Sequence, residues 1–571
     1  MDQAKEPSGP LHLLLSACLF FIFFLQCAFS MAGKSPTYDE VVHAPAGMTE
    51  ILTGSHRLVN DHPPLFRYLL ALPLFFHQPH VPFASEAWTT KDPVDRRYDF
   101  GRKFFFGSGN DADDLLFTSR LVVVIFSLFL GILVLSFSTL VFGRWAGLFS
   151  LFIFVFDPNV LAHARIAKND MFLTVFLFMT FYQLYLTIRE NSTKNLLLLG
   201  LVYGMALATK YSALAVLPII LFLLWRFQGG GREKKIKRIF TAFAQCLMIC
   251  LLGAIVLFCS YILFDGQVKE YRKAFSEQQD LVKEYTLVQQ AKNLWKGLTG
   301  GMRHLEEGHH AYFMGKMKKT SWLGYFPLAF LIKNPLPLLA FFLFAVLIFL
   351  FEKRDKKEIH VFLISIVVIF FLFLVFFSLN LGYRYMLPLH PLLAVYCGVI
   401  VAFIKERKKA MLTAVFFLLC TWYAAGSLRI YPDYLAYFNE AAGGPDRGSE
   451  YLVDSNLDWG QDLKGLKVYM DEEGLDWIYL VYFGQDDPLY RKIRFSPDLT
   501  SFSLRPGGRD VIEKAFVTAA EAYVKEKPGY FAISATHLRG VYLDNPEFFK
   551  YLWDKRPVAN IGHSIFIYRI L

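Results

Sequence analysis

Charged residues are scarce in this chain of 571 residues, at 19% of the total, against about 25% in a typical soluble domain. Hydrophobic residues make up 55%, and Phe alone occurs 59 times. The apolar residues form runs that are too long for the core of a globular domain. The composition therefore excludes a disordered chain, a small disulfide scaffold and an ordinary soluble enzyme, and it requires a membrane protein.

Cysteine and the common signature motifs are also scarce or missing. The sequence contains no CxxC pair, P-loop, GxGxxG fingerprint or serine nucleophile elbow, so the chemistry that these motifs carry is not expected. No internal repeat is visible. A disulfide framework is not expected either, because all the cysteines lie in apolar runs, at positions 18, 27, 246, 250, 259, 397 and 420.

The net charge of +10 is unevenly distributed. Residues 431–571 contain 21 Asp and Glu against 16 Lys and Arg, so the positive excess belongs to residues 1–430. There the basic residues lie between apolar runs, which is the positive-inside pattern of membrane proteins rather than a nucleic-acid-binding surface. No nucleic-acid partner is expected.

A membrane-spanning helix needs about 20 mostly apolar residues. The first such run, 11–31, is either a cleaved signal peptide or an uncleaved anchor, and its length favours the anchor. Further runs lie near residues 121–142, 145–162, 171–188, 239–264, 335–351, 359–378, 387–404 and 410–430.

Residues 195–225 are apolar except for Lys210. A single helix of this length would reach about 46 Å, which exceeds the membrane core of about 30 Å. Basic residues flank the stretch on both sides, so both ends are predicted to be cytoplasmic. We therefore expect a hairpin of two short helices, with Thr209 and Lys210 at a tip below the outer membrane surface.

These spans predict a mainly α-helical, polytopic protein with about eleven transmembrane helices, its N-terminus inside and its C-terminus outside. The membrane domain is residues 1–430, with outer loops at 32–120 and 265–334. Within the first loop, the apolar stretch 62–76 is too short to span and is predicted to lie in the membrane interface.

The tail, residues 431–571, is predicted to be a small extracytoplasmic α/β domain. It mixes strand-like and helix-like segments. The strand-like runs are Trp477–Phe483, Tyr530–Ala535 and Ser564–Ile570, and the helix-like runs are Asp462–Glu472 and Val511–Lys525.

Four basic residues on the predicted outer side run against the charge bias: Arg165, Lys168, Lys210 and Arg384. A lysine inside the membrane is costly and needs a partner, which for Lys210 is either an anionic head group or an acidic side chain. For Arg384 the alternatives are a phosphate, which suits the planar guanidinium, and snorkelling to the interface.

The carboxylates offer further candidates. Asp39 and Glu40 are adjacent near the outer end of the first span, where Asp39 is either a general base whose pKa its neighbour raises or part of a solvated turn that caps a helix. Asp157, before Pro158, is expected to be structural. Asp170 either caps the following helix or has a functional role.

Several short motifs, and the order in which they follow one another, resemble the GT-C membrane glycosyltransferases of the protein O-mannosyltransferase and lipid A aminoarabinose transferase group. The bacterial phospholipid carrier-dependent members are the most similar in character. The resemblance covers most of residues 11–430 and rests on Asp39-Glu40, His62-Pro-Pro-Leu65, Pro158…His163…Arg165…Asp170, Ala208-Thr-Lys-Tyr-Ser212, Gly308-His309, Tyr325-Phe-Pro…Lys333 and Arg384-Tyr-Met-Leu-Pro388.

The resemblance implies a mannosyltransferase-like enzyme of a bacterial inner membrane that transfers a hexosyl or pentosyl group from a polyprenyl-phosphate donor, with inversion. The acceptor would be a hydroxyl of protein Ser or Thr, or of a lipid or glycan. No certain cofactor is implied, and a divalent metal is not expected. The resemblance implies that Asp39 is the base, and that Glu40 and Asp170 position the acceptor or tune the base. It implies Lys210 and Arg384 as ligands of the donor phosphate, with Arg67 and His62 as weaker candidates. Candidate substrate-binding residues are His163, Arg165, His309 and Lys333.

The chemistry of such a donor agrees with this residue set. Its leaving group is already a phosphate anion, so one carboxylate base and two or three cations suffice, without the second carboxyl group of a glycoside hydrolase. The alternative is a transporter or lipid-carrier flippase that uses the same charges. Because the sequence shows no repeated halves and its candidate charges gather at one face, catalysis is favoured over transport.

Overall fold

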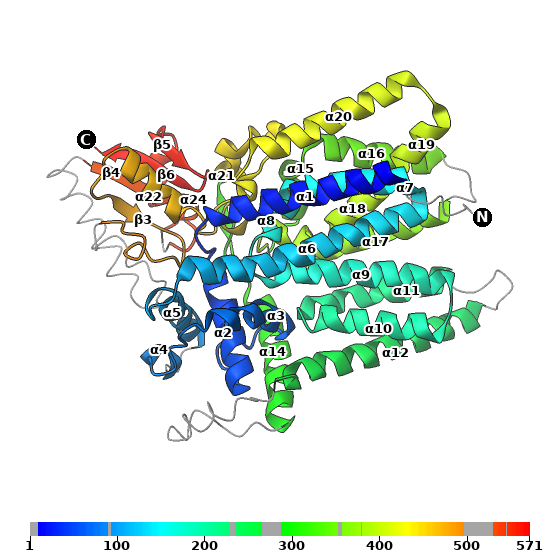
Figure 1. The fold of residues 1–571 in the computed structure, drawn as a ribbon, viewed down its shortest axis with the longest axis horizontal. Coiled ribbons are helices and arrows are strands. Elements are labelled where there is room, and N and C mark those ends of the chain that lie inside the picture. Colours follow the sequence, from blue (N-terminus) through cyan, green and yellow to red (C-terminus); the bar gives the residue numbers. More distant parts are fainter. Residues whose placement is uncertain are drawn as a thin grey trace.

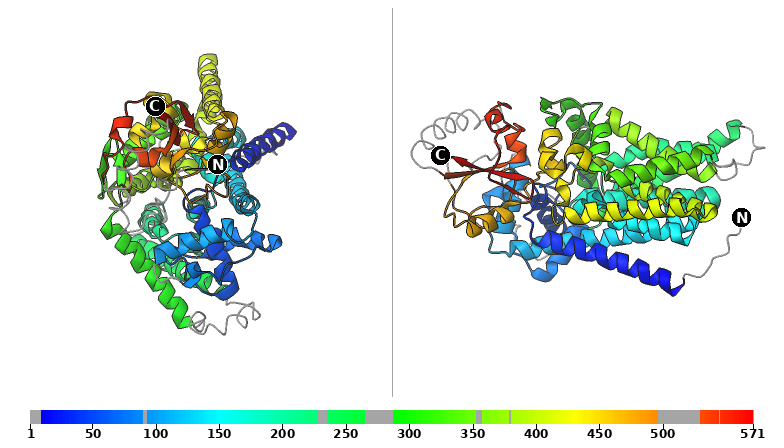
Figure 2. Two further views of the ribbon diagram at one scale, coloured as in Figure 1. Left: turned by 90° about the vertical axis from the view of Figure 1, so that its left-hand side faces the viewer. Right: turned by 90° about the horizontal axis from the view of Figure 1, so that it is seen from above.

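The computed structural model describes residues 9–89, 93–227, 235–264, 287–351, 357–377, 380–495, 529–543 and 545–570. Its long helices run side by side along the longest axis of the molecule (Figure 1). Shorter helices and a small sheet gather at one end of this bundle, which we call the polar end (Figures 1 and 2).

In the described part of the chain, seven spans are long and apolar enough to cross a membrane. Two further pairs of helices, each bent at a short break, bring the total to nine if each pair is one span: α7 (Arg144–Val155) with α8 (Pro158–Ala164), bent by 65°, and α15 (Tyr325–Lys333) with α16 (Leu336–Phe351), bent by 110°. The seven spans are α1 (Pro10–Ala32), α6 (Ala112–Phe142), α9 (Asn169–Arg189), α12 (Lys235–Ile262), α17 (Lys357–Phe377), α18 (Leu389–Cys397) continued by α19 (Val399–Arg407), and α20 (Ala410–Arg429).

The predicted hairpin is present. It consists of α10 (Thr193–Leu207), the 3-10 turn η2 (Tyr211–Val216) and α11 (Leu217–Phe227), with Thr209 and Lys210 between the first two. Helix α10 packs closely on α12, because a Cβ atom added to Gly204 would lie 2.6 Å from the Cβ of Val256. Small residues such as Gly204 let membrane helices approach each other closely.

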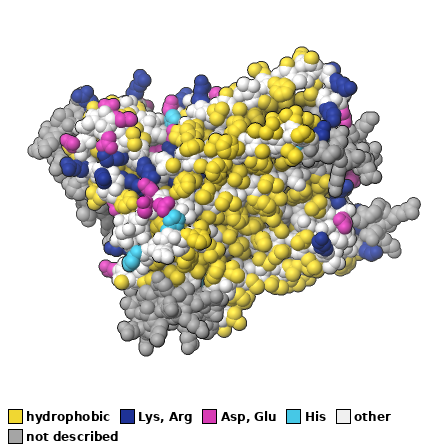
Figure 3. All heavy atoms as spheres, in the orientation of Figure 1, with side chains coloured by type: hydrophobic (Ala, Val, Ile, Leu, Met, Phe, Trp, Pro, Cys, Tyr) yellow, Lys and Arg dark blue, Asp and Glu magenta, His cyan; other side chains and the backbone are white. Residues whose placement is uncertain are grey.

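The surface of the bundle is that of a membrane protein. Hydrophobic side chains cover the face shown in Figure 3, between charged residues at its two ends. Many are large and exposed, such as Phe21 at 62% and Phe29 at 66%. Soluble monomeric proteins do not normally expose an apolar patch of this extent. The chain is thus a multi-pass membrane protein, and the expected mainly helical, polytopic fold is confirmed.

The loop 32–120 folds into helices at the polar end. The stretch predicted to lie in the interface forms α3 (Leu65–Ala71) and η1 (Leu72–His77). Helix α3 packs on α2 (Glu40–Thr53) with Phe66 and Leu70 fully buried, whereas Phe76 of η1 is 90% exposed. The other elements of the loops 32–120 and 265–334 are α4 (Glu86–Thr89), α5 (Pro93–Phe106), α14 (Leu287–Glu307), β1 (Ala311–Phe313) and β2 (Lys316–Lys318).

The tail contains the expected small α/β domain. Its sheet has the strand order β3-β4-β6-β5, with β3 parallel to β4 and the other pairs antiparallel. The predicted helix at 511–525 lies outside the described residues. The elements are α22 (Leu463–Glu472), β3 (Tyr479–Val481), β4 (Gly529–Ser534), α24 (Ala535–Leu538), β5 (Ala559–Ile561) and β6 (Ile565–Ile570), joined to α20 by short turns that include α21 (Gly448–Tyr451).

Candidate active site

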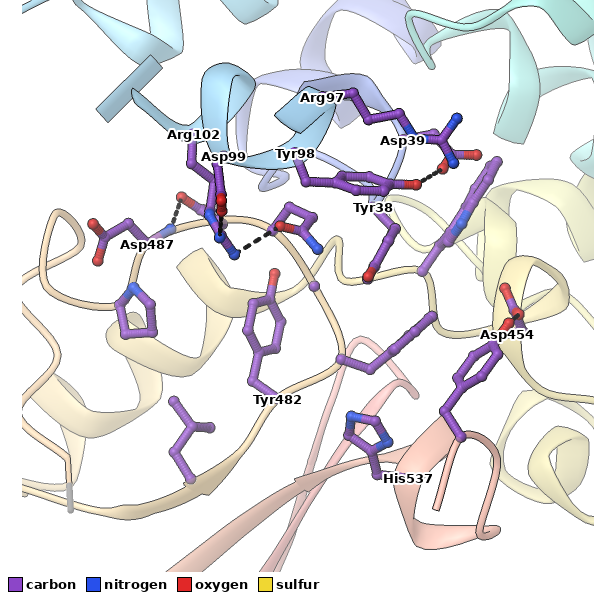
Figure 4. Close-up of a pocket in the computed structure, with 18 of the residues that line it drawn as sticks. Tyr38, Asp39, Arg97, Tyr98, Asp99, Arg102, Asp454, Tyr482, Asp487 and His537 are labelled. Carbon is purple, nitrogen blue, oxygen red and sulfur yellow. Dashed lines mark hydrogen bonds and ion pairs between the residues drawn. The ribbon is translucent and has the colours of Figure 1, made fainter. Parts of the chain in front are cut away.

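A cavity of about 480 Å³ lies at the polar end, where the loop after α1, helix α5 and the C-terminal domain meet (Figure 4). Its size is that of a small-molecule site, about 300–1,000 Å³. Asp39 and Arg384 line it together with Trp459. The cavity therefore joins three of the residues expected to be functional, Asp39, Arg384 and His309, to a part of the tail that had no assigned role.

The Asp39 carboxylate is held by three side chains from separate segments. Lys168, in the connection between α8 and α9, forms an ion pair with it. The hydroxyl of Tyr98, on α5, donates a hydrogen bond to it at 3.2 Å (Figure 4). Arg384 Nη1 lies 3.7 Å from its Oδ2 atom. Asp39 is thus an anchored carboxylate in a cationic setting, rather than part of a solvated turn.

The pKa of Asp39 differs from the expected one. Burial opposes ionisation, but the charges of Lys168 and Arg384 outweigh it, and the pKa lies below its ordinary value. The expectation that Glu40 raises this pKa was wrong. Glu40 instead forms a buried ion pair with Arg120 at 2.7 Å and accepts the backbone N–H of Ala167 at 2.7 Å, so it holds the loop in place.

The two cations beside Asp39 share an aromatic neighbour. Lys168 Nζ and the Arg384 guanidinium each lie 4.5 Å from the centre of the Trp459 ring. Burial, followed by the repulsion of Arg384, lowers the pKa of Lys168 to about 8, although Asp39 partly offsets the decrease. The site thus contains an ammonium group that titrates near neutral pH.

Lys210 has an acidic partner in this structure. Its Nζ lies 2.9 Å from Oδ1 of Asp170, and it also lies 4.5 Å from the ring of Tyr385. Asp170 does not cap α9, which begins one residue before it without a side-chain cap. Among the described residues, no hydrogen-bond partner reaches Oδ2 of Asp170 or Nε of Arg384. Buried polar atoms of this kind are costly and favour a polar ligand.

Asp157 has the structural role that was expected of it. Its side chain accepts the backbone N–H groups of Asn159 and Val160 at the start of α8, and it pairs with His390 at 2.6 Å. The break before Pro158 bends the span that had been expected to run straight through residues 145–162.

The structure does not bring Arg67 and His62 to the cavity wall. The Arg67 side chain is fully buried, lies 2.6 Å from Glu50 and donates to the carbonyl group of His62 at 3.0 Å. These contacts tie α3 to α2. Arg67 is therefore engaged within the protein rather than presented to a ligand.

The four candidate substrate-binding residues are divided. His309 lines the cavity. Lys333 is buried and donates to the carbonyl groups of Leu435 and Asn456 at 2.9 and 2.6 Å. Arg165 donates to the carbonyl group of Ser30 at 2.6 Å. His163 is buried within α8. Arg165 thus connects two segments of the bundle, and Lys333 connects α15 to the chain that follows α20.

The sequence analysis did not identify several residues that form the site. Lys168 had a detectable signal, since it was one of the four basic residues on the wrong side of the charge bias. Trp459 lay in a tail motif with no role. Tyr98 and Arg102 gave no signal, because α5 reaches the site only through the tertiary fold. Within the described residues, no group of three or more His, Cys, Asp or Glu side chains is arranged to hold a metal ion.

The whole chain is similar to solved structures at low sequence identity. No curated protein matches it in sequence. ArnT from Cupriavidus metallidurans, in a crystal structure with undecaprenyl phosphate, has 12% identity over 98% of both chains and a TM-score of 0.47. The oligosaccharyltransferase AglB from Archaeoglobus fulgidus, in complex with an inhibitory peptide and a dolichol-phosphate, has 12% identity over 93% of this chain and 71% of its own, with a TM-score of 0.48.

A family match covers the middle of the membrane domain. Residues 112–258, from α6 to α12, match the family described as dolichyl-phosphate-mannose-protein mannosyltransferase. This segment contains Lys168, Asp170 and Lys210. For residues 112–258, this match confirms the predicted resemblance to membrane glycosyltransferases of the protein O-mannosyltransferase group.

Proposed function

We propose that this protein is a membrane glycosyltransferase that moves a sugar from a polyprenyl-phosphate donor to an acceptor hydroxyl, with inversion. One observation carries the proposal: the Asp39 carboxylate lies in a cavity between the cations Lys168 and Arg384. A base and phosphate-binding groups are thereby within reach of one another. The cavity lies at the polar end of an apolar helical bundle, as a lipid-linked donor requires.

The donor phosphate is proposed to bind Arg384 and Lys168, with Lys210 as a further ligand. Tyr385 follows Arg384 in the sequence, and its ring contacts Lys210. This contact brings the hairpin tip toward Arg384. The unpaired Nε of Arg384 is available for a phosphate oxygen. The isoprenoid tail would remain among the apolar helices. The family match supports a donor of the dolichyl-phosphate-mannose type.

Transfer then needs one proton acceptor. The acceptor oxygen attacks the anomeric carbon from the side opposite the phosphate, the bond from that carbon to the phosphate oxygen breaks, and the electron pair leaves with the polyprenyl phosphate. The hydroxyl proton moves to Asp39. Attack from the opposite side inverts the anomeric centre. The cations stabilise the charge that develops on the phosphate.

The depressed pKa of Asp39 fits the resting state of such a site. A carboxylate that two cations stabilise is a weak base. When the donor phosphate binds, it competes for the charges of Lys168 and Arg384 and weakens their hold on Asp39. Donor binding would therefore strengthen the base. In this scheme Glu40 positions Asp39 through the loop, and Asp170 holds Lys210.

The same proposal places the protein in a bacterial inner membrane, with its N-terminus in the cytoplasm and the polar end in the periplasm. The acceptor is a hydroxyl of protein Ser or Thr, or of a lipid or glycan.

Donor binding tests the phosphate site. In the purified full chain, Arg384→Ala should weaken binding of undecaprenyl phosphate by about tenfold or more, the value of one charge-assisted hydrogen bond. Arg447→Ala is the control, because Arg447 is exposed and pairs with Glu450 outside the cavity. Equal affinity of the unmutated and Arg384→Ala proteins would contradict the phosphate site.

A further inference from the structure

We propose that the acceptor is a neutral saccharide, and that the cavity wall beyond Asp39 is its binding site. The inference rests on the proposed function and names its acceptor class. It is drawn from the part of the cavity that the transfer chemistry does not use. This part is formed by Tyr38, the side chains of α5 and the segment that follows β3.

One side of this wall is a row of stacked aromatic rings. The rings of Tyr38 and Phe483 stack with centres 5.1 Å apart, and those of Phe483 and Tyr542 with centres 5.5 Å apart, each at an angle of 20°. The ring of Tyr98 meets Tyr38 edge-on at 5.0 Å. Because Phe483 stacks on both Tyr38 and Tyr542, the row offers a sugar the outer parts of the two tyrosine rings, whose apolar body and polar hydroxyl suit the mixed surface of a saccharide. Because Tyr98 meets this row and its hydroxyl donates to Asp39, a sugar on the row lies near the carboxylate.

The other side carries planar polar groups, and its cation Arg102 is already paired. Arg102 forms an ion pair with Asp99 and donates to Oε1 of Gln485 at 3.1 Å (Figure 4). Asp487 lies beside them in the same wall. These groups both donate and accept hydrogen bonds, which matches hydroxyl groups that do the same.

The pairing of charges argues against a phosphorylated acceptor. A phosphate group needs an excess of positive charge, but Arg102 is balanced by Asp99, and Asp486 by Arg491 at 2.8 Å. The excess cations of the cavity lie beside Asp39, where the donor phosphate is proposed to bind. The far wall is thus suited to a neutral ligand.

The wall is also poorly suited to an extended peptide. Peptides commonly add a strand to an open sheet edge. The edge nearest the cavity belongs to β3, and the chain covers it there: the backbone N–H of Ile478 donates to the carbonyl group of Arg494 at 3.1 Å, and Ile478 pairs with Phe495. Aromatic rings and polar side chains line the cavity beside this covered edge.

Binding of defined probes to the full chain in lipid nanodiscs tests the inference. The probes are short neutral oligosaccharides of hexose or N-acetylhexosamine, a Ser/Thr-rich decapeptide and a glucosamine disaccharide with two phosphates. We expect saccharide binding, with affinity reduced about tenfold in Arg102→Ala and in Gln485→Ala. The exposed-site variant Arg447→Ala should bind like the unmutated protein.

Undecaprenyl phosphate binding is measured on the same samples. It should be unchanged in Arg102→Ala and Gln485→Ala, which also shows that both variants are folded. Absence of saccharide binding, equal saccharide affinity in all variants, or binding of the peptide or the phosphorylated disaccharide with the same loss in Arg102→Ala would overturn the inference. Saccharide binding by a protein that does not bind undecaprenyl phosphate would instead overturn the proposed donor.

Discussion

At the scale of single residues, the environment of Asp39 is set by tertiary neighbours and not by the adjacent Glu40. Lys168, Arg384 and Tyr98 reach its carboxylate from three segments. Glu40 turns away to Arg120. Two carboxylates that are neighbours in sequence thus have separate roles, one facing the cavity and one holding the loop.

The lowered pKa of Lys168 gives the site a defined pH dependence. Its ammonium form predominates below about pH 8 and is lost as the pH rises through that value. Affinity for undecaprenyl phosphate should therefore fall between about pH 7 and 9, a range in which the phosphate itself, with a second pKa near 6, is already doubly ionised. Titration of carrier binding against pH measures this effect.

Lys168→Arg is the matched variant for this prediction. The guanidinium stays protonated throughout the range, so the decrease in affinity should largely disappear. If the unmutated and Lys168→Arg proteins show the same pH profile, another group causes the decrease and Lys168 does not hold the phosphate.

Lys210 and Arg384 were singled out in the sequence because each is costly or runs against the charge bias at its predicted position, and Asp39 because it resembles a family residue. Charge bias also marked Lys168, although it could not identify the partner. The direction of the Asp39 pKa shift was wrong, since it depends on distances to Lys168 and Arg384 that no local pattern contains. Arg67 was a candidate phosphate ligand in the sequence, which could not reveal that Arg67 pairs with Glu50.

At the scale of elements, the hairpin of α10 and α11 positions Lys210. Gly204 lets α10 lie against α12, since a Cβ atom there would be 2.6 Å from the Cβ of Val256. Gly204→Leu should push the helices apart and destabilise the fold by about 1–3 kcal/mol. A lower thermal unfolding midpoint in detergent would show this.

Gly426→Leu provides the control within α20, because no atom lies within 4 Å of its added Cβ position. It should leave the midpoint nearly unchanged. An equal midpoint for Gly204→Leu and the unmutated protein would mean that the packing of α10 on α12 does not stabilise the hairpin.

Hydropathy located the helices better than it located their ends and bends. The hairpin was predictable, because 31 apolar residues are too many for one span and the charges at both flanks agree. Helix α6 begins at Ala112, before the predicted position, because its first turns carry Asp113, Asp114 and Arg120 and are not apolar. The 110° bend before α16 and the three-residue strand β5 left no periodic signal.

At the scale of the whole molecule, the cavity is built from segments that are distant in the sequence. The loop after α1 supplies Asp39, helix α5 supplies Tyr98 and Arg102, the turn before α18 supplies Arg384, and the C-terminal domain supplies Trp459 and the segment after β3. The domain and its strands β3, β4 and β6 were predicted from strand-like and helix-like runs. The role of this domain as a wall of the cavity was not predicted, because no sequence pattern indicates which segments the domain contacts.

The orientation of the molecule is testable by accessibility. A protein tag at the C-terminus should be reachable by an impermeant reagent on cells whose inner membrane is intact, whereas a tag at the N-terminus should require permeabilisation. Charge bias supports this orientation. The reverse pattern would place the cavity on the cytoplasmic side and contradict the proposed site of transfer.

The most direct test is quantitative mass spectrometry of protein, lipid and cell-wall glycans in cells that lack the gene and are complemented with the unmutated gene or with Asp39→Asn. The unmutated gene should restore a missing glycan. Asp39→Asn should reduce it by about a hundredfold or more, the usual contribution of a general base, while the purified variant still binds undecaprenyl phosphate. Full restoration of the glycan by Asp39→Asn would contradict the account.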